Sequence, residues 1–430
     1  MKKDKNKNDN DLKSMIDRMN YLHIISQKIS EKKPLPLLLN EIMESCKLIM
    51  NAEASSLLLY ESATKKLNFL VAIGNQGKLI KQYSVDIGTG IAGWVAENRK
   101  PLLIEDCYND PRFNPKYDQL TEFMTKSMIC VPLIRKNNLL GIIQVINRKD
   151  GKNFDKEDFM VFEILASQCA IAIENARLIE IQVENEAFER ELETARKIQM
   201  KLLPDKLPEY SDIQVVAKLT PAKMVGGDYY NIIKINDNES FFIIADVSGK
   251  GIPAALIVST INSCLQTYLS LNPVFFDINI FVNNLNEVLI KATTVDKFVT
   301  CWFGLYNHTN KNLKSINASH NPPFIFRKDL SEPVELKKGG LVQGVMKNNY
   351  EVEEVNLKTD DLLILYTDGI TEAMDSQKIQ YGEDRFISLI KNNINLSAMN
   401  LMKVIEMDIH SHVKNAKQSD DLTYIVIKIL

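Results

Sequence analysis

Four aspartates in the second half of the sequence lie at the ends of apolar, strand-like runs. Asp228 follows two glycines, Asp246 closes the run FFIIA, Asp368 closes LLILYT, and Asp420 comes directly before DLTYIVIKI. A carboxylate at a strand end projects from a rigid base, and neighbouring glycines let the backbone and a ligand approach closely. We therefore expect the four side chains to converge in the folded chain.

Carboxylates, water and a backbone carbonyl are the ligands of hard cations such as Mg²⁺ or Mn²⁺, whereas zinc would require grouped His and Cys residues, which this region lacks. Two such ions about 3.5 to 4 Å apart can activate a bridging water and bind phosphate oxygens during in-line attack. A single Asp before Gly is more often a turn residue. The prediction of two Mn²⁺ or Mg²⁺ ions therefore rests on all four aspartates together, which would repel one another without cations.

The motifs around these aspartates also follow the order of a known family. VGGDYYNI, FFIIADVSGKGIPAAL, SINASHNPPFI, LLILYTDGITEA and SDDLTYIVIKI, with ARKIQMKLLP upstream, resemble the SpoIIE-like branch of the metal-dependent PPM serine/threonine protein phosphatases. The resemblance covers about residues 193–430. It implies an α+β domain in which two packed antiparallel sheets are flanked by helices, with the dimetal centre at one edge.

The resemblance also implies roles for individual residues. Asp228 and Asp246 correspond to the ligands that bridge or hold the metal pair, and the carbonyl of Val247 corresponds to the backbone ligand beside them. Asp368 and Asp420 correspond to the remaining carboxylate ligands. Catalysis would then proceed through a metal-activated water.

Five positions near these motifs have open roles. Ser248 stands where the wider family places a His proposed as general acid, so the acid that protonates the leaving group is unassigned. Ser319 replaces a usual Gly, and the neighbouring His320 either orients the site or is structural. Lys250 either contacts substrate phosphate or lies in solvent, and Asp421, where the family often has Asn, is treated as a neighbour of the site.

A long helix is expected upstream of the phosphatase motifs, over residues 155–203. This stretch contains neither Gly nor Pro and is rich in helix formers. From Phe162 to Val183, apolar residues alternate at spacings of three and four, which is the seam of a coiled coil. At roughly 1.5 Å per residue the helix would reach about 70 Å, more than one domain can cover. We expect a homodimer through this helix; alternatively, its first half packs on its own domain and the second is a solvated spacer.

The region before the helix contains IGTGIAGWVAENRKPLLIEDCYNDPRF and SMICVPLIRKNNLLGIIQVINRKDGKNFDKEDF. Gly88, Gly90 and Gly93 imitate a dinucleotide fingerprint, but the stretch from Gly93 to Pro101 is too short for the helical crossover that parallel strands require. The two motifs instead resemble a GAF domain over about residues 12–178. This resemblance implies an α/β sensor with a central antiparallel sheet and a pocket beneath its loops.

The ligand of this pocket is open. Cyclic-nucleotide-binding GAF domains carry an N-K...F-x-x-x-D-E signature, which Asn147, Arg148, Phe154 and Asp158 match in part, with Phe159 in place of the final Glu. Asn147 and Asp158 are therefore candidate ligand-binding residues. The alternative is that they cap the start of the long helix, where acidic side chains favour the positive end of the helix dipole.

Composition limits the remaining possibilities. With 430 residues, 45% hydrophobic and 25% charged, the chain is globular and long enough for two or three domains. A net charge of −3 provides no field that attracts nucleic acid or anionic lipid, and no apolar stretch approaches the roughly 18 residues of a membrane span. The six cysteines are scattered without C-x-x-C, which fits a reducing cytoplasm.

The sequence thus predicts a disordered tail over residues 1–11, a GAF domain over 12–178, a linker helix over 155–203 and a phosphatase domain over 205–430. The predicted function is a cytoplasmic protein phosphatase, with no nucleic-acid or membrane partner, regulated by its GAF domain. In related proteins the substrate is commonly a phosphorylated STAS-domain anti-sigma factor antagonist of a bacterial partner-switching pathway, so the resemblance implies that partner. The alternative is a non-catalytic, nucleotide-sensing adaptor, against which the complete set of aspartates argues.

Overall fold

The computed structural model of the chain describes residues 33–430 except 75–76, 273–274 and 295. The predicted tail over residues 1–11 lies outside the described residues. The chain divides into two compact units with the boundary between Glu186 and Ala187. Each unit has its own sheet system and its own cores.

The first unit is built on one six-stranded antiparallel sheet in the order β3-β2-β1-β6-β5-β4. Its elements are α2 (Leu35–Ile49), β1 (Ala52–Glu61), β2 (Lys66–Ile73), α3 (Gly77–Ile80), β3 (Ser84–Asp86), α4 (Gly90–Asn98), β4 (Leu102–Ile104), α5 (Lys116–Thr121), β5 (Met128–Arg135) and β6 (Asn138–Arg148). Helices pack on both faces of the sheet, so the predicted sensor fold with a central antiparallel sheet is confirmed.

The long helix α6 (Lys156–Met200) begins in this unit and continues into the second. Its first turns pack with α2 against the sheet, where Phe162, Leu165 and Cys169 are fully buried. Further along, Ile179 and Val183 of the same apolar seam are 50% and 58% exposed. The first half of the seam therefore packs on its own domain, which was the alternative to a homodimer. The second half of the seam is exposed in the single chain.

The second unit contains two antiparallel sheets, apart from one short parallel pairing between β11 and β14. One sheet has the order β14-β11-β10-β9-β8, with β15 beside β11, and the other has the order β13-β12-β16-β17-β7. The strands are β7 (Ile213–Thr220), β8 (Tyr229–Lys234), β9 (Glu239–Val247), β10 (Val299–Asn307), β11 (Asn312–Ala318), β12 (Phe324–Phe326), β13 (Val334–Glu335), β14 (Gly339–Gly340), β15 (Glu353–Asn356), β16 (Leu362–Tyr366) and β17 (Leu422–Ile429).

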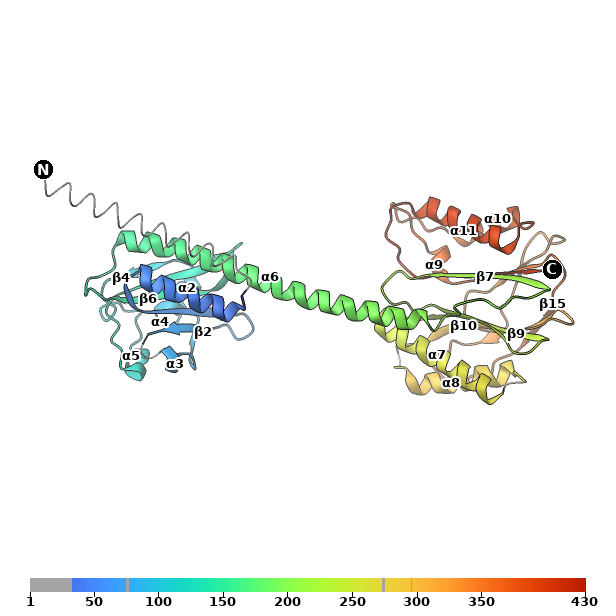
Figure 1. Ribbon diagram of the computed structural model, residues 1–430, viewed down its shortest axis with the longest axis horizontal. Coiled ribbons are helices and arrows are strands. Elements are labelled where there is room, and N and C mark those ends of the chain that lie inside the picture. The colour runs from blue at the N-terminus through green and yellow to red at the C-terminus, as the bar shows by residue number, and fades with distance from the viewer. Residues whose placement is uncertain (1–32, 75–76, 273–274, 295) are drawn as a thin grey trace. The chain divides into compact units, whose positions relative to one another are not determined.

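The two sheets lie between two pairs of helices, which gives four layers (Figure 1). Helices α7 (Ile252–Leu271) and α8 (Ile278–Ala292) cover the first sheet, and α10 (Glu383–Asn392) and α11 (Ala398–Val413) cover the second. A short helix, α9 (Asp368–Thr371), follows β16. The predicted α+β architecture of two packed sheets flanked by helices is confirmed.

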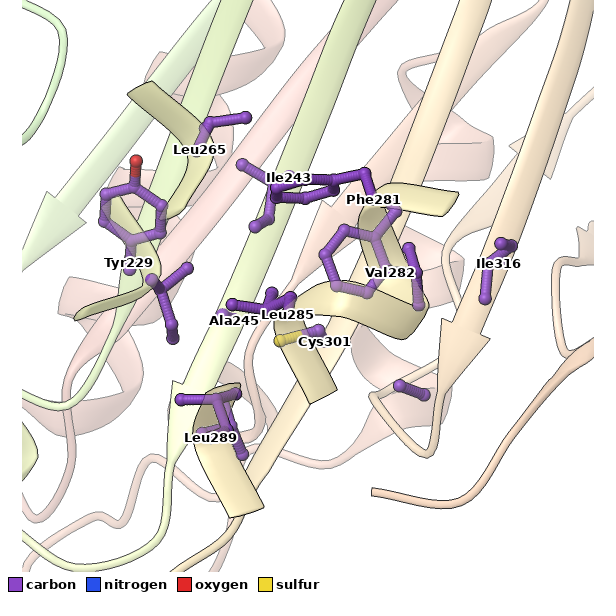
Figure 2. Close-up of a cluster of buried hydrophobic side chains, with 14 of the residues drawn as sticks. Tyr229, Ile243, Ala245, Leu265, Phe281, Val282, Leu285, Leu289, Cys301 and Ile316 are labelled. Carbon is purple, nitrogen blue, oxygen red and sulfur yellow. The ribbon is translucent and has the colours of Figure 1, made fainter. Parts of the chain in front are cut away.

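Strand β9 shows how this layering fixes side-chain direction. Ile243 and Ala245 face α7 and α8 in the core shown in Figure 2, whereas Phe242 and Ile244 face the second sheet. Because side chains alternate along a strand, Asp246 continues the series of Phe242 and Ile244. Its carboxylate therefore leaves the strand on the side that faces the other sheet.

Two helices, α6 and α7, each contain a window of 18 residues that is apolar enough to cross a membrane by length and composition. The expectation that no stretch approaches this length is therefore wrong. The buried residues of α6 belong to the core of the first unit, and those of α7 belong to the core of Figure 2. Core helices commonly pass the same test, so the finding is weak evidence for a span.

The N-terminus of α8 allows a test of this packing. The Asp277 carboxylate accepts hydrogen bonds from the backbone N–H groups of Asn279 and Ile280 at 2.9 and 3.0 Å. Asp277→Ala should lower the free energy of unfolding by about 0.5–2 kcal/mol, or about 2–4 °C in Tm for each kcal/mol in a domain of this size, in a thermal melt. Asp237→Ala is the control, since that side chain is 96% exposed; equal melts for both variants would contradict the capping role.

Candidate metal centre

Two of the predicted ligands come from adjacent strands of the first sheet. Asp228 directly precedes β8 and Asp246 lies near the end of β9, its hydrogen-bonded neighbour. The N–H of Val247 donates to the carbonyl of Gly227 at 3.3 Å. A Cβ on Gly227 would lie 2.9 Å from the carbonyl oxygen of Val247. Only glycine therefore lets the Asp228 loop lie against the carbonyl predicted as a backbone ligand.

The other two ligands come from the second sheet. Asp368 follows β16 at the start of α9, and Asp420 lies just before β17, which pairs with β16. A Cβ on Gly369 would overlap the backbone carbonyl of Asp421. The close approach of these two loops thus requires the D-G pair seen in the sequence, and it brings Asp368 next to Asp420.

Two threonines connect the sheets at Asp228. The hydroxyl of Thr367 donates to the Asp228 Oδ2 at 2.8 Å, and the hydroxyl of Thr423 donates to the same oxygen. Both threonines are fully buried. They fix the carboxylate of Asp228 and leave its Oδ1 directed away from these two bonds. No sequence pattern indicated these two threonines, because their role depends on how the two sheets stack.

Asp421 holds the loop that carries Asp228. Its carboxylate accepts hydrogen bonds from the backbone N–H groups of Ala222, Gly227 and Asp228 at 2.8, 2.7 and 3.3 Å. The sequence motifs indicated Asp421 only as a neighbour of the site. The Asp-Asp doublet was the available signal, but the three backbone donors lie about 200 residues away in the chain.

Burial and the negative charges of neighbouring carboxylates raise the pKa values of three of the four aspartates. Burial and then the negative charge of Asp246 raise the pKa of Asp228 well above its usual range. Burial, followed by Asp368 and Asp420, raises the pKa of Asp246 to about 7. The pKa of Asp368 is also raised, chiefly by burial and then by Glu372 and Asp420. These effects indicate that carboxylates from both sheets lie near one another, and metal binding by the four aspartates stays a prediction.

Lys250 is a cation inside this group. Its Nζ lies 2.7 Å from the Asp420 Oδ2 and donates to the carbonyl of Ser419 at 2.6 Å. Its positive charge also offsets part of the rise in the pKa values of Asp246 and Asp368. Lys250 is thus exposed, as one of its two expected roles requires, but it is also ion-paired at the site, and contact with substrate phosphate stays a prediction.

The donor set suits a hard divalent cation. It consists of carboxylates and one backbone carbonyl, and the carboxylates are destabilised as anions, which a cation would relieve. Within the described residues, no three His, Cys, Asp or Glu side chains are already arranged at distances that suit a metal ion. At Asp420 the reason is visible, because its Oδ1 accepts from the N–H of Asp421 and its Oδ2 pairs with Lys250.

The remaining positions near the site have structural contacts. His320 is 4% exposed, its Nδ1 lies 2.9 Å from the Thr300 hydroxyl, and burial lowers its pKa to about 4. The Ser248 hydroxyl accepts from the N–H of Phe298 at 2.9 Å. Ser319 has φ +56°, in the left-handed region that favours the glycine of its relatives. These contacts give His320 and Ser248 no direct hydrogen bond to the four aspartates.

In the first unit, Asn147 and Asp158 make contacts that fix loops. The Asn147 Oδ1 accepts from the N–H groups of Lys126 and Ser127 at 2.7 and 3.2 Å. The Asp158 Oδ2 lies 2.6 Å from Arg148. A role of these residues in ligand binding stays a prediction.

A cavity of about 100 Å³ also lies in the first unit. Its lining combines aliphatic and aromatic side chains with polar ones, and it includes Phe69, Tyr117, Asp118, Thr125 and Gln144 but neither Asn147 nor Asp158. If a ligand binds in this cavity, its direct contacts are therefore with other residues than the two taken from the nucleotide signature.

Comparisons with known proteins agree with this geometry. The family model of the GAF domain matches residues 34–173, and the model of stage II sporulation protein E (SpoIIE) matches residues 236–430. The phosphoserine phosphatase RsbU of Bacillus subtilis is 30% identical over 277 residues, which cover 64% of this chain and 79% of RsbU. The chain belongs to the SpoIIE family of PP2C-type phosphatases.

Two further similarities concern a curated protein and a solved structure. Protein IcfG of Synechocystis is 28% identical over 277 residues, covering 58% of this chain but only 43% of IcfG, so the chain spans less than half of that relative. The solved SiaA-PP2C domain of Pseudomonas aeruginosa has a TM-score of 0.50 at 18% identity and covers 58% of this chain and all of the SiaA domain, which supports the fold alone.

The raised pKa of Asp246 gives this phosphatase a testable pH dependence. Below its unfolded pKa near 4, a carboxyl whose pKa rises on folding does not change the free energy of unfolding. As the pH rises from there towards its folded pKa of about 7, the carboxyl lowers the free energy of unfolding progressively. In EDTA, the Tm should therefore fall between pH 5 and 7.5, and Asp246→Asn should weaken this fall and raise the Tm at pH 7.5 by a few degrees. The measurement is a thermal melt at both pH values.

The control for this experiment is Asp237→Asn. This exposed carboxylate has its pKa lowered, chiefly by the hydrogen bond from Lys234, so the substitution should leave the slope between pH 5 and 7.5 unchanged. An identical pH slope in wild type and Asp246→Asn would show that the four carboxylates do not repel one another.

Proposed function

We propose that this chain hydrolyses phosphoserine or phosphothreonine on a protein substrate, under control of its GAF domain. The observation that carries the proposal is the convergence of Asp228, Asp246, Asp368 and Asp420 from two sheets, in a chain whose relative RsbU is named a phosphoserine phosphatase. The predicted extents of 12–178 for the sensor, 155–203 for the linker and 205–430 for the phosphatase are part of this proposal.

The proposal assigns two Mn²⁺ or Mg²⁺ ions to Asp228, Asp246, Asp368, Asp420 and the carbonyl of Val247. When bound, the ions supply an activated water and electrostatic stabilisation of the phosphate oxygens. The chain contributes the fixed orientation of the ligands, through the threonine hydroxyls on Asp228 and the carboxylate of Asp421 behind its loop. Rigid ligands allow the site to favour the transition state without reorganising.

We further propose that the substrate is a phosphorylated STAS-domain anti-sigma factor antagonist in a bacterial partner-switching pathway, and that the protein is cytoplasmic. A groove of about 460 Å³ starts beside the aspartates at Gly369 and Ser419 and is lined by apolar side chains such as Met374, Met407 and Leu422. A groove of this kind suits the surface of a protein around a phosphorylated side chain.

A catalytic test uses a chromogenic phosphate ester with Mn²⁺. Asp246→Asn and Asp368→Asn should each lower kcat/KM by roughly 10²-fold or more, because each removes a charged ligand from the reacting centre. Asp237→Asn should leave the rate unchanged, since its carboxylate lies on an exposed turn. Equal rates in all variants would refute the site, and incubation with phosphorylated STAS proteins would identify the substrate.

We also propose that the protein is a homodimer through α6. The seam residue Ile179 is 50% exposed in the single chain, and Ile181 is similarly exposed at 53% but lies off the seam. Ile179→Glu should therefore convert a dimer into a monomer in light scattering, because it places a charge in the seam. Ile181→Glu makes the same chemical change and should remain dimeric. A monomeric wild-type protein would contradict the proposal.

A further inference from the structure

The last turn of the linker helix contacts the loop that carries Asp228. The side-chain Nε2 of Gln199 donates to the carbonyl of Gly226 at 2.7 Å, and the N–H of Gly226 donates to the Gln199 Oε1 at 3.0 Å. One amide thus satisfies both backbone groups of a single residue. This paired arrangement fixes the distance between the helix and the loop as well as the direction of approach.

The same loop is held on its other side by Asp421. The Asp421 carboxylate accepts from the N–H groups of Gly227 and Asp228, and a Cβ on Gly226 would overlap its Oδ2. The three residues before β8 therefore lie between a side chain of the helix and a side chain at the start of β17. A displacement of either side must shift the backbone of Asp228 or break these bonds.

The helix end is itself anchored in the phosphatase unit. The N–H of Leu202 donates to the backbone carbonyl of Gln199 at 2.9 Å, and Leu202 and Leu203 pack against the cores on both sides of the first sheet. By contrast, Ile198 is 63% exposed. The last turn of α6 thus has one face on the metal-binding loop and another open to a partner.

We propose that Gln199 is a positioning residue through which the linker helix sets the place of Asp228, and so the affinity of the site for its metal. A ligand or partner that shifts the end of α6 then changes activity through Gly226, without contacting the site. This inference rests on the proposed function, because it assigns a regulatory input to the same centre.

The first test needs no metal. In EDTA, Gln199→Ala should raise the rate of amide hydrogen exchange in peptides covering residues 222–228 by roughly tenfold, the effect of losing one to two hydrogen bonds. Exchange in β9 should not change, since a general loss of stability would affect both segments. Gln182→Ala is the matched control, because its amide lies on the same helix and bonds to Glu186.

The second test measures Mn²⁺ binding to the full chain by calorimetry. Gln199→Ala should weaken binding roughly tenfold, with kcat restored at saturating Mn²⁺, whereas a purely structural role would lower kcat at every Mn²⁺ concentration. Gln199→Glu retains the acceptor for the Gly226 N–H and should have an intermediate effect. Unchanged exchange and unchanged Mn²⁺ affinity in Gln199→Ala would overturn this inference and leave the phosphatase function intact. A wild-type protein that neither binds Mn²⁺ nor cleaves phosphate esters would overturn both.

Discussion

The second half of this protein depends on bringing carboxylates together where water is partly excluded. Burial and mutual repulsion both disfavour the charged forms, as the raised pKa values of Asp228 and Asp246 show. The surrounding structure offsets this cost locally, with two threonine hydroxyls on Asp228 and the ammonium of Lys250 on Asp420. Such a site persists only if its supporting elements cannot relax away from one another.

The stacked sheets provide that rigidity. The site draws on residues from about 220 to 423, and each contact across the sheets depends on strand register. A slip of one residue in β9 would turn Asp246 towards α7 and α8 and place Val247 between the sheets. The dense core of Figure 2 opposes such a slip, because the side chains from Phe241 to Ala245 already alternate between the two cores. Packing far from the aspartates therefore determines their convergence.

Much of this arrangement could be predicted from the sequence, because it depends on residues that are close together in the chain. Strand-end aspartates with adjacent glycines and a helix without Gly or Pro are patterns within short segments. The helix α6, observed over Lys156–Met200, could therefore be predicted, and the four aspartates could be proposed as ligands. The roles of Asp421, Thr367 and Gln199 could not, because each acts on a residue far away in the chain. The partial match of Asn147 to a nucleotide signature likewise does not indicate its four hydrogen bonds, three with a loop and one with Glu53 of β1.

In the regulation that we propose, the linker helix α6 carries the signal to the phosphatase unit. Hydrogen bonds along α6 make it a stiff element, with one end buried in the sensor core and Gln199 at the other. A stiff helix does not by itself regulate activity. Coupling between two sites requires an element with two arrangements, and each site must be able to favour one of them. The exposed seam around Ile179 is such an element if two copies pair there, because pairing can set the rotation of the helix. A rotation that moves Gln199 must then move Gly226 or break its two hydrogen bonds, and Asp228, two residues further on, is the proposed ligand most directly affected.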